Sequence, residues 1–248
     1  MAEPRKLDWD SDFFGFTVVE AHSTRSGEGD LDRVVGAACQ MGATLLVYTV
    51  PAGSPVSLPG RAAHVDVRHT YICDYSRITF GPPEAAHLIE FHEGRDPLPE
   101  LDRLALLSGQ HSRFFNDPLF PRPAAEALYT TWMRRALTRE FGDHVLVARD
   151  PDGVIAAMYS GRIDSAGFGV PDLMAVDPRL RGRALGAGFL QTSMLHYRER
   201  GIVKGRLRSQ GRNRFARAIY ERLGWTLAAC EDVYHVWLGV PPVKEYSS

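Results

Sequence analysis

The chain has 248 residues and a mass of 27.6 kDa, enough for one large domain or two small ones with an apolar core. Apolar residues make up 44% and charged residues 24%, a soluble globular profile that excludes a wholly disordered, collagen-like or coiled-coil chain. With 29 basic and 30 acidic side chains, the net charge of -1 argues against a globally basic nucleic-acid-binding protein.

The cysteines and the N-terminus indicate the compartment. Cys39, Cys73 and Cys230 are odd in number, far apart and without a CxxC pair, so a disulfide framework or structural zinc site is not expected. We expect three buried thiols in a reducing compartment. The N-terminus has no secretory signal, and no apolar run approaches the roughly 18 residues of a membrane span. These features predict a cytoplasmic protein without a metal and without a membrane partner.

The first half of the chain alternates helical and extended patterns. Apolar spacing predicts a helix over 30–42, and the run TLLVYTV predicts a buried strand over 44–50. Residues 63–75 alternate like a half-exposed strand, and a Gly- and Pro-rich segment near 81–83 then interrupts the pattern. Helices are expected over 98–108 and over 124–141, the second with Pro123 at its start, where the missing N–H costs nothing.

The second half has a clearer order. Strands are expected over 144–149 and 154–163, joined as an antiparallel hairpin by the turn Asp150-Pro151-Asp152-Gly153. A strand over 173–176, a helix over 182–199, a strand over 205–208, a helix over 212–223 capped by Gly224, and a strand over 232–238 follow. The pattern predicts an α/β protein. We expect a small N-terminal α/β domain over residues 1–100, packed against a larger domain over residues 101–248.

Positive charge is concentrated in one stretch. From Val176 to Trp225 there are twelve Lys or Arg and three Asp or Glu, which gives +9 here and -10 in the rest of the chain. Such an excess favours a polyanionic partner. The alternative is a solvated helix face.

The segment LMAVDPRLRGRALGAGFL, residues 173–190, suggests an anion site. A short apolar strand ends at Val176, and Asp177-Pro178 then leads the chain out of the sheet. Small residues between flanking arginines open the next helix, whose first N–H groups have no intrahelical partner and carry about half a positive charge. This pattern suits a pyrophosphate. The glycine spacing is neither GxGxxG nor a P-loop, so a helix whose small face packs closely on a sheet is the alternative.

Two segments together resemble the GCN5-related N-acetyltransferase (GNAT) family. Its phosphate loop, Val-x-Pro-x-x-Arg/Gln-Gly-x-Gly-x-Gly/Ala, is matched by Val176, Pro178, Arg181, Gly182, Gly186 and Ala187. Its later helix is matched by Asn213, Ala216, Tyr220, Glu221, Gly224 and Trp225. The resemblance spans roughly residues 144–238 and implies a mixed, mostly antiparallel sheet flanked by helices. One position departs from the pattern: Ala184 stands at the middle glycine of the loop, where its methyl group narrows the approach of a phosphate.

A narrower resemblance covers most of the chain. LDWDSDFFGF at 7–16, HSRF at 111–114 and the Ser-Gln-x-x-Asn run at 209–213 are similar to motifs of the TDP-fucosamine acetyltransferase group. This resemblance implies that the acceptor is the 4-amino group of a dTDP-linked 4-amino-4,6-dideoxyhexose. Relatives with other acceptors share these motifs, so another small-molecule amine, an antibiotic or a protein N-terminus stays open. A non-catalytic acyl-CoA-binding module is the alternative of another class.

The family resemblance also assigns roles to residues. Acetyl-CoA is expected between two splayed strands, with the backbone of Met174, Ala175 and Val176 on its pantetheine arm. The pyrophosphate is expected on Arg181, Gly182, Arg183, Ala184, Leu185, Gly186 and Ala187. Asn213 would bond the pantetheine amide or act as a helix N-cap. Tyr220 would protonate the leaving thiolate or lie in the core.

The sequence gives little about the acceptor side. No general base stands out among His111, Asp117, Asp12 and a water chain. Arg113 is a candidate for an acceptor phosphate or for an ion pair between the halves. Phe13 and Phe14 are expected in the core. The family pattern also suggests a homodimer.

Overall fold

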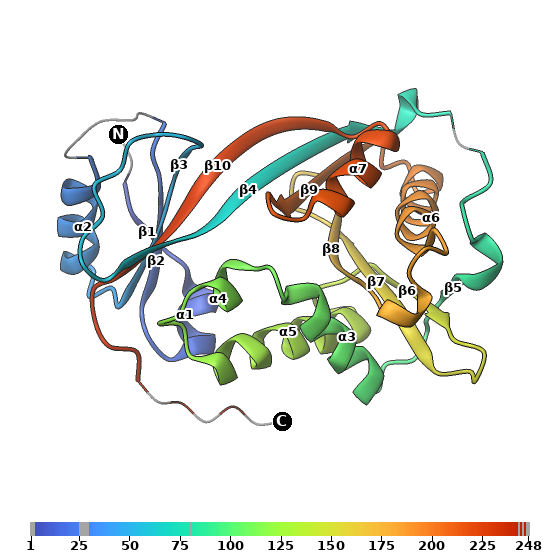
Figure 1. Cartoon of the computed structure of the whole chain (residues 1–248), viewed down its shortest axis with the longest axis horizontal. Helices are drawn as coiled ribbons and strands as arrows, with labels where there is room; N and C mark the ends of the chain where they lie inside the picture. The colour runs from blue at the N-terminus through green and yellow to red at the C-terminus, as the bar shows by residue number, and fades with distance from the viewer. Residues whose placement is uncertain (1–2, 25–29, 80, 243, 245, 247–248) are drawn as a thin grey trace.

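The computed structural model describes residues 3–24, 30–79, 81–242, 244 and 246 (Figure 1). Ten described strands form one sheet in the order β1-β2-β3-β10-β4-β9-β8-β7-β6-β5. They are β1 (Arg5–Lys6), β2 (Val18–His22), β3 (Leu45–Pro51), β4 (Ala62–Asp74), β5 (Glu90–Phe91), β6 (His144–Arg149), β7 (Ile155–Ile163), β8 (Gly169–Val176), β9 (Lys204–Gln210) and β10 (Thr226–Trp237). Within these residues the pairs β2–β3 and β8–β9 are parallel and the others antiparallel. The expected mixed, mostly antiparallel sheet is confirmed.

Helices cover both faces of this sheet (Figure 1). They are α1 (Asp8–Phe14), α2 (Asp30–Gln40), α3 (Pro99–Gly109), α4 (Arg113–Asn116), α5 (Arg122–Leu137), α6 (Leu185–Glu199) and α7 (Arg214–Arg222). Apolar side chains of α1, α3, α4 and α5 form one core with one face of the sheet. On the opposite face, α6 and α7 form a second core and α2 forms a third. No helix in the described part of the chain combines the length and apolar character that crossing a membrane requires.

The strands β4 and β10 join the two halves of the chain. They run side by side from the α2 end of the sheet to the α7 end (Figure 1). β4 lies between β10 and β9, so a strand before residue 100 completes the sheet of the later segment. The domain boundary at residue 100 stays a prediction.

Most expected elements are present, and the differences have local causes. The helix expected over 182–199 begins at Leu185, because Gly182 (φ 79°) and Ala184 (φ 58°) are left-handed. The strand expected over 173–176 begins earlier, at Gly169. Gly224 caps α7 with φ 84°, as predicted. The expectation of three buried thiols holds for Cys73 alone, because Cys39 is exposed on α2 and Cys230 is half-buried. All three cysteines are free.

The glycines of the loop and helix have different roles. A Cβ at Gly188 would lie 2.0 Å from the carbonyl oxygen of Glu84, so this glycine permits close packing of α6. A Cβ at Gly182 would meet nothing within 4 Å, and its positive φ is what favours glycine there. The close-packing reading of the glycine pattern therefore holds at Gly188, and the pyrophosphate reading stays a prediction.

Candidate active site

The strands β8 and β9 separate after a single paired position. Within the described chain, β8 pairs with β9 only at Gly169 and Gly205, whereas it pairs with β7 along its whole length. The β7–β8 register shifts where Ser160 faces Leu173 and Gly161 faces Pro171, which makes Asp172 the extra residue of a bulge. A bulge bends its strand. The edge of β8 beyond Gly169 therefore has backbone groups without a β9 partner, as a V-shaped opening requires.

A cavity of about 320 Å³ lies at this opening. One side is formed by Met174 of β8, by β9 and by α7, and the other side by α3, α4 and α5. The lining residues used below are Glu20, Asp66, Arg68, Arg113, Asp172, Met174, Arg208, Ser209, Asn213 and Tyr220. Three of the residues expected from the sequence, Met174, Asn213 and Tyr220, thus meet at one cavity.

Tyr220 is almost buried at this cavity and is 9% exposed. Burial raises the pKa of Tyr220 to about 12, against the effect of a hydrogen bond with the Ser209 side chain. Its ring packs against Tyr71 with the centroids 5.5 Å apart. The phenol is therefore protonated at every pH at which the protein would work, and it is available as a hydrogen-bond donor.

Asn213 is the N-cap of α7. Its side-chain oxygen accepts a hydrogen bond from the N–H of Ala216 at 3.1 Å. This is the capping role expected as an alternative, and it leaves the amide NH₂ group at the cavity wall. Capping holds α7, and with it Tyr220, against the end of β9.

The loop after β8 is held at its base and open at its tip. Asp177 accepts a hydrogen bond from the N–H of Arg179 at 3.0 Å and lies 2.9 Å from the guanidinium of Arg103. The Arg179 hydrogen bonds are the main cause that lowers the pKa of Asp177 to about 2. Arg181 and Arg183 are exposed and make no ion pair within the described chain. Residues 175, 176 and 181–187, expected at the cofactor from the sequence, do not line this cavity.

Ala184 occupies the position where the sequence departs from the family pattern. It precedes α6 and has φ 58° and ψ 13°. An alanine in this left-handed conformation is strained by about 1–2 kcal/mol, and a glycine is not. Ala184 is exposed, so its methyl group faces solvent at the mouth of the loop.

Two carboxylates at the cavity were not found from the sequence. The Asp172 side chain is 19% exposed and accepts a hydrogen bond from Arg162 at 3.0 Å, yet its partial burial raises the pKa of Asp172 to about 7. Burial likewise raises the pKa of Asp66 to about 6. The described residues that line the cavity include none of His111, Asp117 and Asp12. An isolated acidic residue beside an apolar strand was the available signal for Asp172, but the expected strand began one residue later.

Asp117 instead belongs to a closed hydrogen-bonded group. Its carboxylate lies 2.7 Å from Nδ1 of His235 and accepts a hydrogen bond from the Trp237 indole at 2.9 Å. Burial lowers the pKa of His235 to about 4, so the ring is neutral near pH 7. The other ring nitrogen of His235 is 3.5 Å from Arg113, whose guanidinium also stacks on Phe114 at 4.4 Å. This group positions Arg113 at the cavity.

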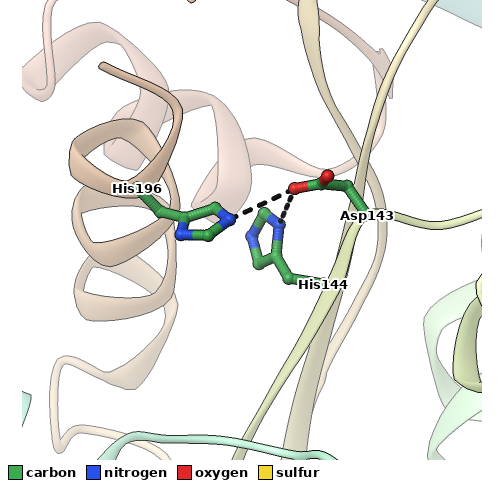
Figure 2. A group of neighbouring side chains, drawn as sticks. All are labelled: Asp143, His144 and His196. Atoms are coloured by element: carbon green, nitrogen blue, oxygen red, sulfur yellow. Dashed lines mark hydrogen bonds and ion pairs between the residues drawn. The ribbon is translucent and has the colours of Figure 1, made fainter. Parts of the chain in front are cut away.

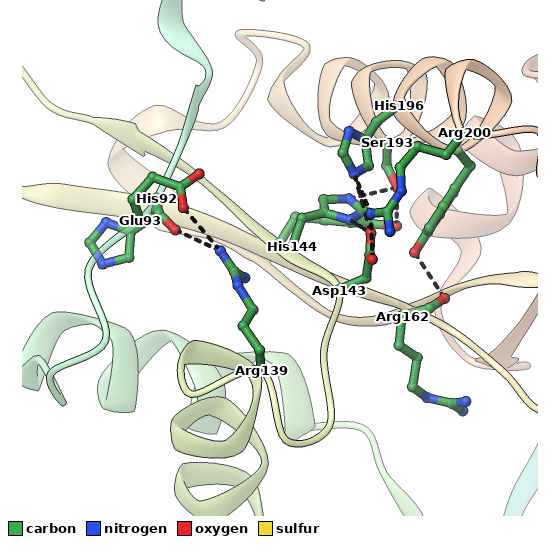
Figure 3. Close-up of polar contacts among 11 residues, drawn as sticks. His92, Glu93, Arg139, Asp143, His144, Arg162, Ser193, His196 and Arg200 are labelled. Atoms are coloured by element: carbon green, nitrogen blue, oxygen red, sulfur yellow. Dashed lines mark hydrogen bonds and ion pairs between the residues drawn. The ribbon is translucent and has the colours of Figure 1, made fainter.

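Asp143, His144 and His196 form a second group, in which His144 is buried and the other two are half-buried (Figure 2). Both histidine rings approach the same carboxylate oxygen of Asp143, at 3.1 Å for His144 and 3.2 Å for His196. Figure 3 shows that Arg200 reaches this carboxylate and that Ser193 lies on the other side of His144. The arrangement has the residue types of a metal site, but Arg200 places a cation 3.3 Å from His196. The prediction that the chain needs no metal stays a prediction.

The comparison with known families matches the later part of the chain. Residues 141–227 match the model of the acetyltransferase (GNAT) domain. This segment is therefore similar to a GNAT acetyltransferase domain, and the chain has the GNAT fold. Among solved structures, a GCN5-related N-acetyltransferase from Sphaerobacter thermophilus is similar over 99% of this chain and 79% of that one, with a TM-score of 0.59 and 17% identity. A GNAT-family protein from Novosphingobium aromaticivorans covers 82% and 79%, with a TM-score of 0.53 and 21% identity.

Curated relatives are similar over parts of this chain. A mycothiol acetyltransferase from Beutenbergia cavernae is 33% identical over 96 residues, 39% of this chain and 31% of that protein. The spore coat polysaccharide biosynthesis protein SpsD from Bacillus subtilis is 29% identical over 140 residues, 55% and 46% of the two chains. The chain thus covers less than half the length of these relatives. The solved structures show the fold, but they do not identify the substrate.

Proposed function

We propose that this GNAT chain transfers the acetyl group of acetyl-CoA directly to a primary amine. The observation that carries the proposal is the opening between β8 and β9, with Tyr220, Asn213 and Met174 around one cavity. The unpaired β8 edge supplies backbone groups for a pantetheine arm. The loop 181–187, with the exposed Arg181 and Arg183, supplies N–H groups and positive charge for the pyrophosphate.

The reaction follows from the groups at the cavity. The amine nitrogen attacks the thioester carbonyl carbon, the carbon–sulfur bond breaks, and coenzyme A leaves as the thiolate. A backbone N–H of the unpaired β8 edge stabilises the oxygen as its charge develops. Asp172 accepts the proton that the amine loses, because its pKa of about 7 suits a base that works near neutral pH.

Tyr220 acts on the leaving sulfur. A thiol titrates at about 8.5, so complete transfer of the phenolic proton to a free thiolate is uphill by about 5 kcal/mol. We therefore assign Tyr220 the donation of a hydrogen bond to the sulfur as it becomes anionic. This hydrogen bond lowers the barrier without requiring an ionised tyrosine.

The acceptor that we favour is the 4-amino group of a dTDP-linked 4-amino-4,6-dideoxyhexose. It is supported by the N-terminal motif at 7–16, by the His111–Phe114 motif and by the relative named for spore coat polysaccharide biosynthesis. The mycothiol acetyltransferase relative favours a different amine as the second candidate. Cytoplasmic location and a homodimer complete the proposal.

The test is the release of thiol from acetyl-CoA, with products identified by mass. The panel contains dTDP-4-amino sugars, free amino sugars, polyamines and short peptides. Turnover confined to the nucleotide sugars supports the favoured acceptor. Turnover on other amines keeps the reaction and changes the acceptor, whereas acetyl-CoA binding without turnover on the whole panel contradicts the reaction.

Tyr220→Phe tests the assignment of the leaving-group donor. We expect kcat to fall about 10- to 100-fold, as for the loss of one hydrogen bond to a charged group, with little change in acetyl-CoA affinity. Tyr71→Phe is the matched control, because Tyr71 packs against Tyr220 but does not line the cavity. Equal effects of the two substitutions would remove the role of Tyr220.

A further inference from the structure

Two guanidinium groups at the cavity lack anionic partners. Within the described chain, Arg113 and Arg208 have no carboxylate oxygen within 4.0 Å, and the contacts of Arg113 are His235 and Phe114. Two other charged groups of the lining are already paired, Arg68 with Glu231 at 2.9 Å and Glu20 with Arg5. Arg113 and Arg208 are thus free to bind a ligand, while Arg68 and Glu20 are committed.

The environment of the two arginines disfavours their charge. Burial lowers the pKa of Arg113, which is half-buried. Arg208 is exposed, and partial burial together with Arg68 and Arg206 lowers its pKa. Asp10 and Asp66 act on Arg113 from beyond ion-pair distance. Because an arginine does not lose its proton, a bound anion is what relieves this unfavourable charge.

Asp172 and Arg208 lie on the two opposite strands of the opening. Gly169 of β8 pairs with Gly205 of β9, and three residues further along each strand stand Asp172 and Arg208. Arg113 comes from α4, across the cavity from the sheet, and the Asp117–His235 group holds it in place. The cavity therefore presents a carboxylate near Met174 and two guanidinium groups from β9 and α4.

We propose that the acceptor carries an anionic group as well as its amine, and that Arg113 and Arg208 bind this anion while Asp172 faces the amine. This inference rests on the proposed function, since it concerns the acceptor of the same reaction. Guanidinium groups recognise phosphates and carboxylates through charge-assisted hydrogen bonds, so a phosphate, a diphosphate or a carboxylate is the chemistry expected. A neutral amine leaves both arginines without a partner.

The experiment measures anion binding apart from catalysis. Coenzyme A is first added to saturation, so that the cofactor loop is occupied, and three probes are then titrated by calorimetry: dTDP, glucosamine 6-phosphate and β-alanine. The tightest probe identifies the anion as a diphosphate, a phosphomonoester or a carboxylate. Glucosamine is the neutral match for glucosamine 6-phosphate.

The variants Arg113→Gln and Arg208→Gln locate the binding. We expect each to weaken the tightest probe about 10- to 100-fold, the effect of one hydrogen bond between charged groups. Arg122→Gln, on the exposed side of α5, leaves binding unchanged. The inference is overturned if no probe binds better than glucosamine, or if the two cavity variants bind as the wild type does.

The same preparations separate this inference from the proposed function. Thiol release with neutral amines as fast as with their anionic matches, unaffected by Arg113→Gln, refutes the anion site and keeps the acetyl transfer. Anion binding that depends on both arginines, without thiol release on the whole panel, refutes the acetyl transfer and keeps the anion site.

Discussion

The Asp143 group and the cavity both bring charged side chains together, but they differ in how completely these are paired. The His144 ring has the Asp143 carboxylate at 3.1 Å on one nitrogen and the Ser193 hydroxyl at 3.0 Å on the other. Ser193 in turn lies 2.8 Å from the hydroxyl of Tyr159. At the cavity, Arg113 and Arg208 have no anionic partner in the described chain. A closed group holds elements together, whereas an open one is available to a ligand.

The two groups also differ in the direction in which the pKa of their carboxylates is shifted from its ordinary value. The hydrogen bond from His144, with help from Arg200, lowers the pKa of Asp143, so this carboxylate is ionised and stabilising. Burial raises the pKa of Asp172, so its ionised form is disfavoured in the folded chain. A raised pKa in an open cavity is typical of a catalytic carboxylate, and a lowered one of a structural ion pair.

The largest expected effect is on catalysis, at Asp172 in the cavity. Asp172→Asn should lower kcat/KM for acetyl transfer by about 10²- to 10⁴-fold, the usual contribution of a general base. In the wild type, kcat/KM should rise with pH to a plateau above a pKa of about 7, because Asp172 must lose its proton to act. The variant should lack this limb when assayed with the same amine. A pH profile shared by both proteins would exclude Asp172 as the base.

The same substitution should stabilise the protein. The pKa of Asp172 is higher in the folded chain than in the unfolded one, so its contribution to stability decreases as pH rises from about 4 to about 7. Asp172→Asn removes this loss, and its Tm at pH 8 should exceed that of the wild type. A lower Tm for Asp172→Asn at pH 8 would place Asp172 with the structural ion pairs.

At the Asp143 group, the expected effect is on the stability of the folded chain. His144→Ala removes a ring that is 2% exposed. The Ser193 hydroxyl and the Asp143 carboxylate then each lose a hydrogen-bond partner. We expect a loss of about 2–4 kcal/mol, seen as a Tm roughly 5–10 °C lower, with kcat/KM of the folded protein near the wild-type value. A stable variant that has lost acetyl transfer would instead make His144 part of the catalytic machinery.

The Asp143 group also makes the stability of the folded chain depend on pH. Burial lowers the pKa of His144, so between about 6.5 and that lower value the unfolded chain binds a proton that the folded chain does not. Stability therefore falls as pH decreases below about 6.5. His144→Phe should reduce the slope without abolishing it, because His235, with its pKa of about 4, acts in the same direction. Urea titrations at pH 5 and pH 7 measure the difference.

The smallest effect is expected at the cofactor loop. Ala184→Gly relieves the left-handed alanine, and after the added flexibility of the unfolded chain we expect a gain of about 1 kcal/mol, or roughly 2–4 °C in Tm. It should also tighten acetyl-CoA binding slightly, by opening the approach to the loop. Thermal unfolding with and without acetyl-CoA measures both. A Tm for Ala184→Gly below that of the wild type would contradict backbone strain at Ala184.

The local elements were predictable because their patterns are local. The hairpin over 144–163 and the helices over 30–42 and 98–108 follow from alternation, apolar spacing and turn residues. The loop motif and Tyr220 followed from family resemblance, and the structure brings Tyr220 to the cavity. The bulge at Asp172 was not predicted, because the residues Gly-Val-Pro-Asp at 169–172 have the composition of a loop.

The charged lining of the cavity was not predictable from the sequence. Asp66, Arg113 and Arg208 come from β4, α4 and β9, and they meet only because β4 inserts between β10 and β9. No sequence spacing records that insertion. Arg113 was a candidate for an acceptor phosphate, but the alternative of an ion pair could be set aside only when its surroundings were known.

The most direct test of the central claim is a crystal structure with acetyl-CoA bound. We predict the pantetheine arm between β8 and β9, hydrogen-bonded to the free edge of β8, the pyrophosphate on the N–H groups of 182–187, and the thioester sulfur within hydrogen-bond distance of Tyr220. Acetyl-CoA bound elsewhere, or lying in the opening with its sulfur far from Tyr220, would contradict the account.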